Sequence, residues 1–222
     1  MCLPIIPSRR WGLGYKAKPT RLFQHVDLMK FVAAADATGH GSVGTAAMIA
    51  FFWLQRQKDI LNRLAWSQYR PADAPDIARI FHHKTLVPID MPLLDEGGNE
   101  LWPELTARLD ASDRHGTLII TRDAPDRFKH VRLPWEKRHF ARTVSKIRKA
   151  AGIDPAIKFM GLRPGGNTEG GDANLTDTQL RALSGHKSPN MTRLYTQQTF
   201  KQRQEAARKR RDLRTKKGQV SE

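Results

Sequence analysis

The sequence predicts a mainly α-helical domain with one small antiparallel β-sheet, an α+β fold. Apolar residues recur at spacings of three and four positions in several segments between residues 23 and 183, as expected for helices with one buried face. Between residues 66 and 91, short runs with β-branched or aromatic residues alternate with turn-forming residues, which is typical of a small antiparallel sheet. The 222 residues suffice for one large domain, or two small ones, with a sizeable core.

The first part of the chain predicts an irregular leader followed by two helices. Residues 1–22 contain three prolines, two glycines and several basic residues, so we expect them to form a basic leader without regular structure. The first helix begins near Phe23 and ends at residues 38–41, and Ser42 is expected to cap the second helix. The buried face of the first consists of Leu28, Phe31, Val32 and Ala35. The buried face of the second consists of Ala47, Ala50, Phe51 and Leu54.

The middle of the chain predicts the sheet. The three expected strands are residues 66–70, 77–83 and 85–91. A tight turn near Lys84 joins the last two. Residues 101–109 have a helical pattern, and residues 117–121 form a short apolar run that suggests a buried strand.

A further helix is expected to begin near Pro134, since proline is tolerated in the first turn. Its buried stripe consists of Phe140, Val144, Ile147 and Ala151. Its other faces carry six cations against the single acid Glu136, so they either contact nucleic acid or form an ordinary solvated surface. The candidate DNA contacts on this helix are Lys137, Arg138, Arg142, Lys146 and Arg148.

The last part of the chain predicts one helix with a clear start and a basic tail. Residues 164–171 are rich in glycine and are a poor helix sequence. Thr176 and Gln179 form a capping-box pattern that opens a helix. Residues 201–222 form a strongly basic tail, whose first half could be helical.

The composition indicates a polyanionic partner. The formal net charge is +16 and the isoelectric point is near 10.5, which favours nucleic acid, with an acidic membrane surface as the alternative. No apolar run is long enough to span a bilayer, and Cys2 is the lone cysteine, so we expect a cytoplasmic protein without an internal disulfide. His82 and His83 would alternate on a strand and are not expected to ligate a metal together, and no cofactor or metal motif is present.

One short segment carries a pattern of reactive residues. Ser184-Gly185-His186 precedes Tyr195, which lies nine positions after the histidine. A phenol has a pKa of about 10, so it attacks well only beside cations or a base. A histidine at a fixed distance could provide a proton acceptor or a hydrogen-bond donor to an oxyanion.

This segment resembles the C-terminal signature of the tyrosine recombinases, also called the phage integrase family. In that family the Gly-His pair precedes the nucleophilic tyrosine by the same distance, so the resemblance implies that Tyr195 is the nucleophile and His186 its histidine partner. Lys187 and Arg193 lie in the same segment and are further candidate DNA contacts.

The resemblance extends to three more positions in the family's order. Arg163 matches the arginine of a His-x-x-Arg box, in which Met160 stands where the family has histidine. Arg56 matches the first family arginine. Asp59 stands in place of the glutamate that follows that arginine in the family, and it would hold Arg56 or the fold. Lys84 matches the lysine of the hairpin turn, which the family uses to protonate the departing 5′-oxygen.

The resemblance covers about residues 23–200 and implies a catalytic domain that cuts and rejoins double-stranded DNA through a 3′-phosphotyrosyl link. It implies no cofactor and a homo-oligomer, usually a tetramer, on DNA, hence an association with the nucleoid. Because few residues precede the pattern, we expect the family's N-terminal clamp domain to be absent. Two alternatives remain: a catalytically impaired or truncated DNA-binding relative, and a relaxing topoisomerase with the same chemistry.

Overall fold

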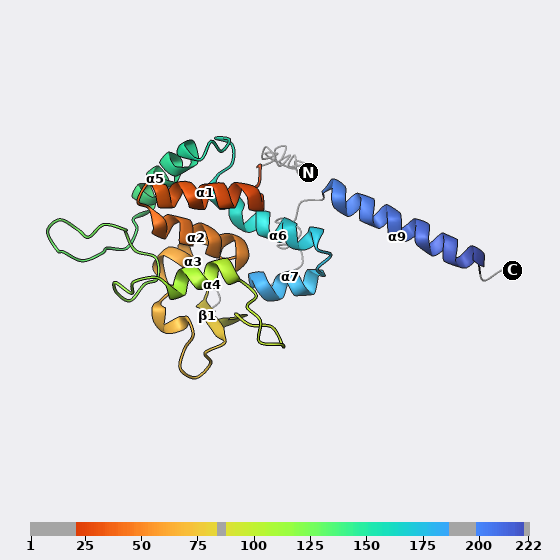
Figure 1. Ribbon diagram of the computed structural model, residues 1–222, viewed down its shortest axis with the longest axis horizontal. Coiled ribbons are helices and arrows are strands. Elements are labelled where there is room, and N and C mark those ends of the chain that lie inside the picture. The colour runs from red at the N-terminus through yellow and green to blue at the C-terminus, as the bar shows by residue number, and fades with distance from the viewer. Residues whose placement is uncertain (1–20, 84–87, 187–198, 220–222) are drawn as a thin grey trace, which may run out of the picture.

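The computed structural model describes residues 21–83, 88–186 and 199–219 and has the predicted mainly helical α+β architecture (Figure 1). Its elements are α1 (His25–Ala37), α2 (Gly41–Phe52), α3 (Gln57–Asn62), η1 (Trp66–Gln68), β1 (Ile77–Phe81), β2 (Pro88–Pro92), α4 (Pro103–Asp110), α5 (Lys137–Ala150), η2 (Phe159–Gly161), α6 (Leu162–Asp172), α7 (Asp177–Ser184) and α9 (Phe200–Gln219). Figure 1 shows a compact body with the sheet at the end opposite α5, and α9 projecting from the side of α6 and α7.

Helix α2 is the central element of the body. Every residue from Val43 to Phe51 is buried, and the helix contains no charged residue. It packs against α1, α3, α4, α5 and α6. A helix that is apolar on all sides must be covered on all sides, so the surrounding helices are arranged around α2.

The predicted buried faces are confirmed for α1 and largely for α5, while Leu54, predicted on the face of the second helix, is buried but lies beyond the end of α2. Leu28, Phe31, Val32 and Ala35 of α1 are all buried. In α5 the buried residues are Phe140, Thr143, Val144 and Ile147, while Ala151 is the partly buried C-cap rather than part of the stripe. Helix α5 begins at Lys137 with Glu136 as its N-cap, so Pro134 precedes the helix and pairs with Thr121 in an isolated bridge.

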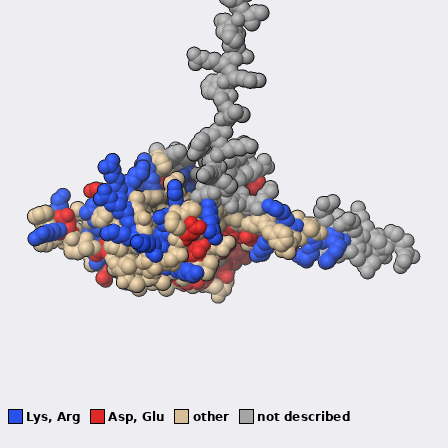
Figure 2. Space-filling view, turned by 90° about the horizontal axis from the view of Figure 1, so that it is seen from above, with Lys and Arg blue, Asp and Glu red and all other residues tan. Residues whose placement is uncertain are grey.

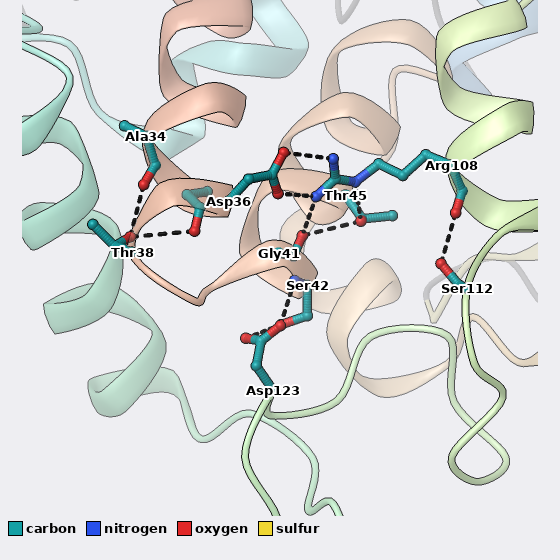
Figure 3. Close-up of polar contacts among 10 residues, drawn as sticks. Ala34, Asp36, Thr38, Gly41, Ser42, Thr45, Arg108, Ser112 and Asp123 are labelled. Carbon is teal, nitrogen blue, oxygen red and sulfur yellow. Dashed lines mark hydrogen bonds and ion pairs between the residues drawn. The ribbon is translucent and has the colours of Figure 1, made fainter.

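The prediction that Ser42 caps α2 is wrong. The N-cap is His40, and Ser42 lies inside the first turn. Its backbone N–H and its Oγ both donate to the Asp123 carboxylate, at 2.7 and 2.8 Å (Figure 3). The negative charge at the positive end of the helix therefore comes from a loop 81 residues away, which a local capping rule cannot detect.

Arg108 of α4 ties the same end of α2 to α1. Its Nε donates to Thr45 Oγ1 at 2.7 Å, and its NH2 donates to the Gly41 carbonyl at 2.9 Å. The guanidinium also forms a two-pronged ion pair with Asp36 near the end of α1, with NH1 at 2.9 Å from Oδ2 (Figure 3). Because these bonds are multiple and partly buried, they fix three helices more firmly than a single surface ion pair would.

The sheet is smaller than predicted. Strands β1 and β2 pair antiparallel, with Ile77 opposite Pro92 and Phe81 opposite Pro88. The predicted strand at 66–70 is wrong, because its first residues form the 3₁₀-helix η1 and only Tyr69 forms a bridge, to Ala78. The predicted strand at 117–121 is also reduced to isolated bridges. The turn near Lys84 lies outside the described residues.

The glycine-rich segment forms helix α6, contrary to its low helix propensity. A Cβ atom on Gly165 would lie 2.2 Å from the Phe23 carbonyl oxygen, and one on Gly166 would lie 2.2 Å from the Phe51 carbonyl oxygen. Each glycine costs about 1 kcal/mol of helix propensity relative to alanine. The missing side chains allow α6 to approach the backbone at the start of α1 and the end of α2 more closely than any other residue would permit.

The predicted start of α7 is confirmed, since Thr176 and Gln179 form a reciprocal capping box. The helix ends at Gly185 with φ +65°, a left-handed conformation typical of a glycine C-cap. The basic tail is helical from Phe200 to Gln219, which extends beyond the first half that the sequence suggested. Among the described residues, no helix combines the length and the apolar character that a membrane span requires.

Replacing Gly165 or Gly166 by alanine is expected to destabilise the protein. The new methyl group would overlap a backbone oxygen that cannot move without shifting a helix, so we expect a net loss of about 1–3 kcal/mol despite the higher helix propensity of alanine. Urea denaturation measures this free energy. Gly170→Ala is the matched control, because its Cβ would meet the flexible ends of Leu180 and Leu175. Equal effects at all three positions would contradict the close-approach explanation.

Candidate active site

Four segments that are distant in the sequence meet at one cleft of about 610 Å³. They are the end of α2 with the turn into α3, α3 itself, the start of α5, and η2 with the start of α6. Arg56 and Arg163 line the cleft, together with Lys58 and Lys137. Four cations around one concave surface create a positive potential that attracts an anion.

Arg56 is presented by a strained turn. After α2 ends at Phe52, Leu54 adopts φ +55°, an unusual conformation for a residue with a side chain. Arg56 then serves as the N-cap of α3, and its half-buried side chain places NH1 at 3.2 Å from His82 Nδ1. The strain is of the order of 1–2 kcal/mol and is offset by the burial of the Leu54 side chain, which is 3% exposed.

Arg163 connects the start of α6 to the end of α7. It is the second residue of α6 and only 6% exposed. Its NH2 donates to the Ser184 carbonyl at 2.8 Å, and its own carbonyl accepts from Asn167 Nδ2 at 2.9 Å. The guanidinium is therefore oriented by the last carbonyls of α7, a favourable place for a cation at the negative end of a helix.

His186 follows directly from the left-handed Gly185. A Cβ on Gly185 would lie 2.2 Å from Ile89 Cδ1 and 2.6 Å from His82 Cε1, so the turn closes against β1 and β2. His186 is 4% exposed, and its carbonyl accepts from Arg181 Nε at 3.3 Å. Burial, followed by the charges of Arg163 and Arg56, lowers the pKa of His186 from 6.5 to about 4, so the imidazole is neutral at neutral pH.

His82 is a fully buried polar residue beside Arg56. It has no exposed surface, and its Nε2 lies 2.6 Å from Gln55 Oε1. Burial first, and then the charge of Arg56, lower the pKa of His82 to about 4. Sequence reasoning considered His82 only as a possible metal ligand and therefore did not predict its contact with Arg56. The alternation of His82 and His83 on a strand was the available signal, because it places one of them toward the core.

Asp59 supports the fold rather than Arg56. It is 2% exposed, and its Oδ1 accepts from the His83 backbone N–H at 3.0 Å and lies 2.9 Å from His83 Nδ1. The sequence left open whether Asp59 holds Arg56 or the fold. These bonds tie α3 to the end of β1, so Asp59 supports the fold. His82 and His83 thus contact different partners.

Met160 lies at the rim of the cleft. It belongs to η2 and is 77% exposed, and it lines the cleft together with Arg56 and Arg163. A thioether carries no proton and only weakly accepts hydrogen bonds. The position is therefore close to the cations but adds neither charge nor a proton donor.

The remaining predicted residues divide into three groups. Lys84, Lys187, Arg193 and Tyr195 lie outside the described residues. The exposed cations of α5 are Lys137, Arg138, Arg142, Lys146 and Lys149. Arg148 is only partly exposed, and its NH1 donates to the Ile157 carbonyl at 3.1 Å, so it supports the loop after α5. Figure 2, seen from above the molecule, shows Lys and Arg gathered over the face on which α5 lies in Figure 1.

Comparisons with known proteins identify the fold. No family model and no curated protein matches the chain. Among solved structures, a lambda integrase (75–356) dimer bound to a COC′ core site aligns with a TM-score of 0.62 and 21% identity over 82% of this chain and 61% of that chain. XerA recombinase aligns with a TM-score of 0.62 and 15% identity over 86% of this chain and 65% of that chain. This chain has the tyrosine recombinase catalytic-domain fold.

The match covers different shares of the solved structures. The chain spans less than two thirds of the lambda integrase and XerA chains above, but 92% of the lambda integrase catalytic core, with a TM-score of 0.55 and 21% identity. Within the tyrosine recombinase fold, Arg56 and Arg163 line one cleft, and the charges of both act on His186. Three of the five residues selected by the sequence resemblance are therefore brought together.

Acidification is expected to destabilise this tyrosine recombinase fold through His82 and His186. Between pH about 6.5 and 4 the unfolded chain binds a proton at each histidine and the folded chain does not. The free energy of unfolding should therefore fall with decreasing pH, by at most about 1.4 kcal/mol per pH unit for each histidine. Urea denaturation between pH 7 and 4.5 measures it. His186→Gln should flatten the dependence, and an unchanged slope in that variant would refute this assignment.

Proposed function

We propose that this protein is a site-specific tyrosine recombinase, an enzyme that cuts and rejoins double-stranded DNA. The observation that carries the proposal is that Arg56 and Arg163, from separate segments, line one cleft, and that the charges of both act on the buried His186. Two guanidinium groups beside a neutral imidazole suit a phosphodiester, because arginine binds non-bridging phosphate oxygens in a fork geometry. The lambda integrase and XerH structures with the same fold are complexes with DNA.

The proposed reaction begins with attack by Tyr195 on a DNA phosphorus. The phenolic oxygen forms a bond to phosphorus while the bond to the 5′-oxygen breaks, which leaves a 3′-phosphotyrosyl link and a free 5′-hydroxyl. Arg56 and Arg163 would hold the non-bridging oxygens as negative charge builds on them. Lys84 would give its proton to the departing 5′-oxygen. Rejoining reverses these steps with a 5′-hydroxyl from another strand, so the phosphodiester energy is retained and no cofactor is consumed.

His186 has a defined role in this proposal. Because its pKa is lowered to about 4, the neutral ring has one N–H donor and one acceptor nitrogen at the working pH. It can donate to a phosphate oxygen or take the proton of Tyr195 as the phenol attacks. A histidine that was protonated throughout could not accept that proton.

The proposed DNA surface runs from the cleft along α5. Lys137 both lines the cleft and opens α5, and the exposed cations Arg138, Arg142 and Lys146 follow at intervals of four residues, which places them along one face of the helix. The partner is double-stranded DNA, and the working form is a homo-oligomer. Solved lambda integrase structures include a dimer on a core site and a tetramer on a Holliday junction.

Helix α9 is a second basic element with a separate role in the proposal. Phe200–Gln219 contains nine Lys or Arg residues against two acids and has no apolar stripe. Its start is anchored to the end of α6, since Gln202 Nε2 donates to Asp172 Oδ1 at 3.0 Å. A helix of this composition gains little from packing on protein and suits phosphates along the duplex.

Met160 supports a second candidate, a DNA-binding relative with impaired catalysis. The proposed reaction uses several proton donors around the phosphate, and an exposed thioether at the rim of the cleft supplies none. Binding would persist in such a protein, because Arg56, Arg163 and the α5 cations do not depend on Met160.

The reaction predicts a covalent adduct. Incubation with a nicked duplex of its own site should give an SDS-resistant protein–DNA complex, and Tyr195→Phe should abolish it because the phenolic oxygen is the nucleophile. Arg163→Lys should lower the rate of adduct formation by roughly 100-fold, because lysine cannot bind a phosphate in the two-pronged geometry of arginine. An adduct that persists in Tyr195→Phe would refute the assignment.

The same assay separates the two candidates. If Met160→His raises adduct formation from none to a measurable level, the hypothesis of an impaired relative is supported. Robust cleavage by the wild-type chain would reject it.

DNA binding should depend steeply on salt. Removing one cation that binds a phosphate lowers the slope of log K against log salt by about 0.9, so Arg142→Gln with Lys146→Gln should reduce the slope by up to about 1.8. Removing residues 200–222 should reduce it further. Arg79→Gln is the control, since Arg79 is already paired with Asp73 and Asp90. A slope that is flat in the wild-type chain would refute DNA binding itself.

A further inference from the structure

His82 lies at the centre of a buried hydrogen-bond chain that ends on Arg56. The chain runs from the Trp53 carbonyl to the Gln55 amide, from Gln55 Oε1 to His82 Nε2 at 2.6 Å, and from His82 Nδ1 to Arg56 NH1 at 3.2 Å. Gln55 is 1% exposed and His82 has no exposed surface. Gln55 and Arg56 both line the cleft, and His82 itself does not, so His82 can act on the cleft through the guanidinium of Arg56.

The directions of these bonds are fixed by the partners. The Gln55 amide nitrogen donates to the Trp53 carbonyl, so its Oε1 is left to accept from His82. His82 consequently carries its hydrogen on Nε2, and the lone pair of Nδ1 accepts from Arg56 NH1. Every polar atom of the chain is satisfied only when the imidazole is neutral.

Burial and the neighbouring positive charges together keep His82 neutral. Burial lowers its pKa most, the charges of Arg56, Arg163 and His83 lower it further, and Asp59 opposes them. A proton on Nδ1 would point a hydrogen at the Arg56 guanidinium and break the last bond of the chain. The acceptor for Arg56 is thus maintained across the ordinary pH range.

The same ring also sets the position of the turn that carries His186. At Gly185 a Cβ would lie 2.6 Å from His82 Cε1 and 3.1 Å from Nδ1, so the backbone of α7 ends directly against the imidazole. One buried side chain therefore contacts both the Arg56 guanidinium and the residue before His186.

We propose that His82 is a positioning residue for phosphate binding: it fixes the direction of the Arg56 guanidinium and its separation from the Gly185–His186 turn. It acts through Arg56, because a residue without exposed surface cannot touch DNA. Arginine has a long side chain with many rotamers, and a buried acceptor restricts it before the substrate arrives. The inference rests on the proposed function, since it assigns Arg56 to the scissile phosphate.

Side-chain dynamics test the inference without requiring activity. In the free protein, ¹⁵N relaxation of Arg56 Nε, assigned by its loss in Arg56→Lys, should show restricted motion. His82→Leu should release it, and His82→Gln, which keeps a donor and an acceptor, should restore part of the restriction. Unchanged motion in His82→Leu would overturn the inference. If His82→Leu does not fold, as judged by urea denaturation, Gln55→Leu removes the acceptor for His82 Nε2 and takes its place.

A double-mutant cycle tests the consequence for catalysis. His82→Leu should lower single-turnover adduct formation by roughly 10- to 100-fold. In an Arg56→Lys background the further loss should be less than about 2-fold, because the two residues act as a unit. The matched control is His83→Leu, whose effect should be the same in both backgrounds, since His83 is bonded to Asp59.

The outcomes distinguish the two proposals. Equal effects of His82→Leu with and without Arg56 would overturn the positioning role. Absence of any adduct in the wild-type chain, together with release of Arg56 in His82→Leu, would leave the positioning role standing and reject the proposed reaction.

Discussion

The site depends on the close contact between the glycines of α6 and the backbone of two earlier elements. Gly165 faces the carbonyl of Phe23, and Gly166 faces the carbonyl of Phe51 in the last turn of α2. Arg163 comes two residues before this contact, and Arg56 comes shortly after Phe51 along the chain. The backbone positions from which Arg56 and Arg163 extend are therefore set by contact of backbone with backbone, which deforms less than packed side chains do. The helix propensity lost at the glycines is the cost of that precision.

The electrostatics of the cleft follow from this arrangement. Arg56 and Arg163 bring two positive charges close to His186, whose pKa is lowered first by burial and then by these two charges. In the proposed function the oxygens of a phosphate would compensate both charges. The contacts that stabilise the fold lie elsewhere, in the apolar surroundings of α2 and in the Arg108 network at its other end.

The sequence was sufficient where a structural rule is local. The buried stripes of α1 and α5 follow from residue spacing, and the capping box of Thr176 and Gln179 follows from hydrogen bonds within one turn. It failed where a distant partner decides. Ser42 resembles an N-cap, but Asp123 supplies the charge at that end of α2. The segment after Arg163 resembles a loop until the carbonyls that its glycines approach are known.

The site shows the same division. Arg56, Arg163 and His186 were selected in advance because a family pattern records their order, whereas the alternation of His82 and His83 indicated only that one of them faces the core. The importance of His82 arises from three contacts, to Gln55, Arg56 and Gly185, that exist only after β1 has packed against the α2–α3 turn and α7. Such a residue has no spacing signature, since its partners are separated from it by different lengths of chain.

Met160 shows that phosphate binding and proton chemistry are physically separable in this cleft. Its side chain is 77% exposed, so it contributes little to the core that orients its neighbours. Arg56 is held by His82, and Arg163 is held by the Ser184 carbonyl. Neither contact involves Met160. A change at this position can therefore remove or add a proton donor without displacing a cation, and the two proposed candidates would share the same anion-holding half of the site.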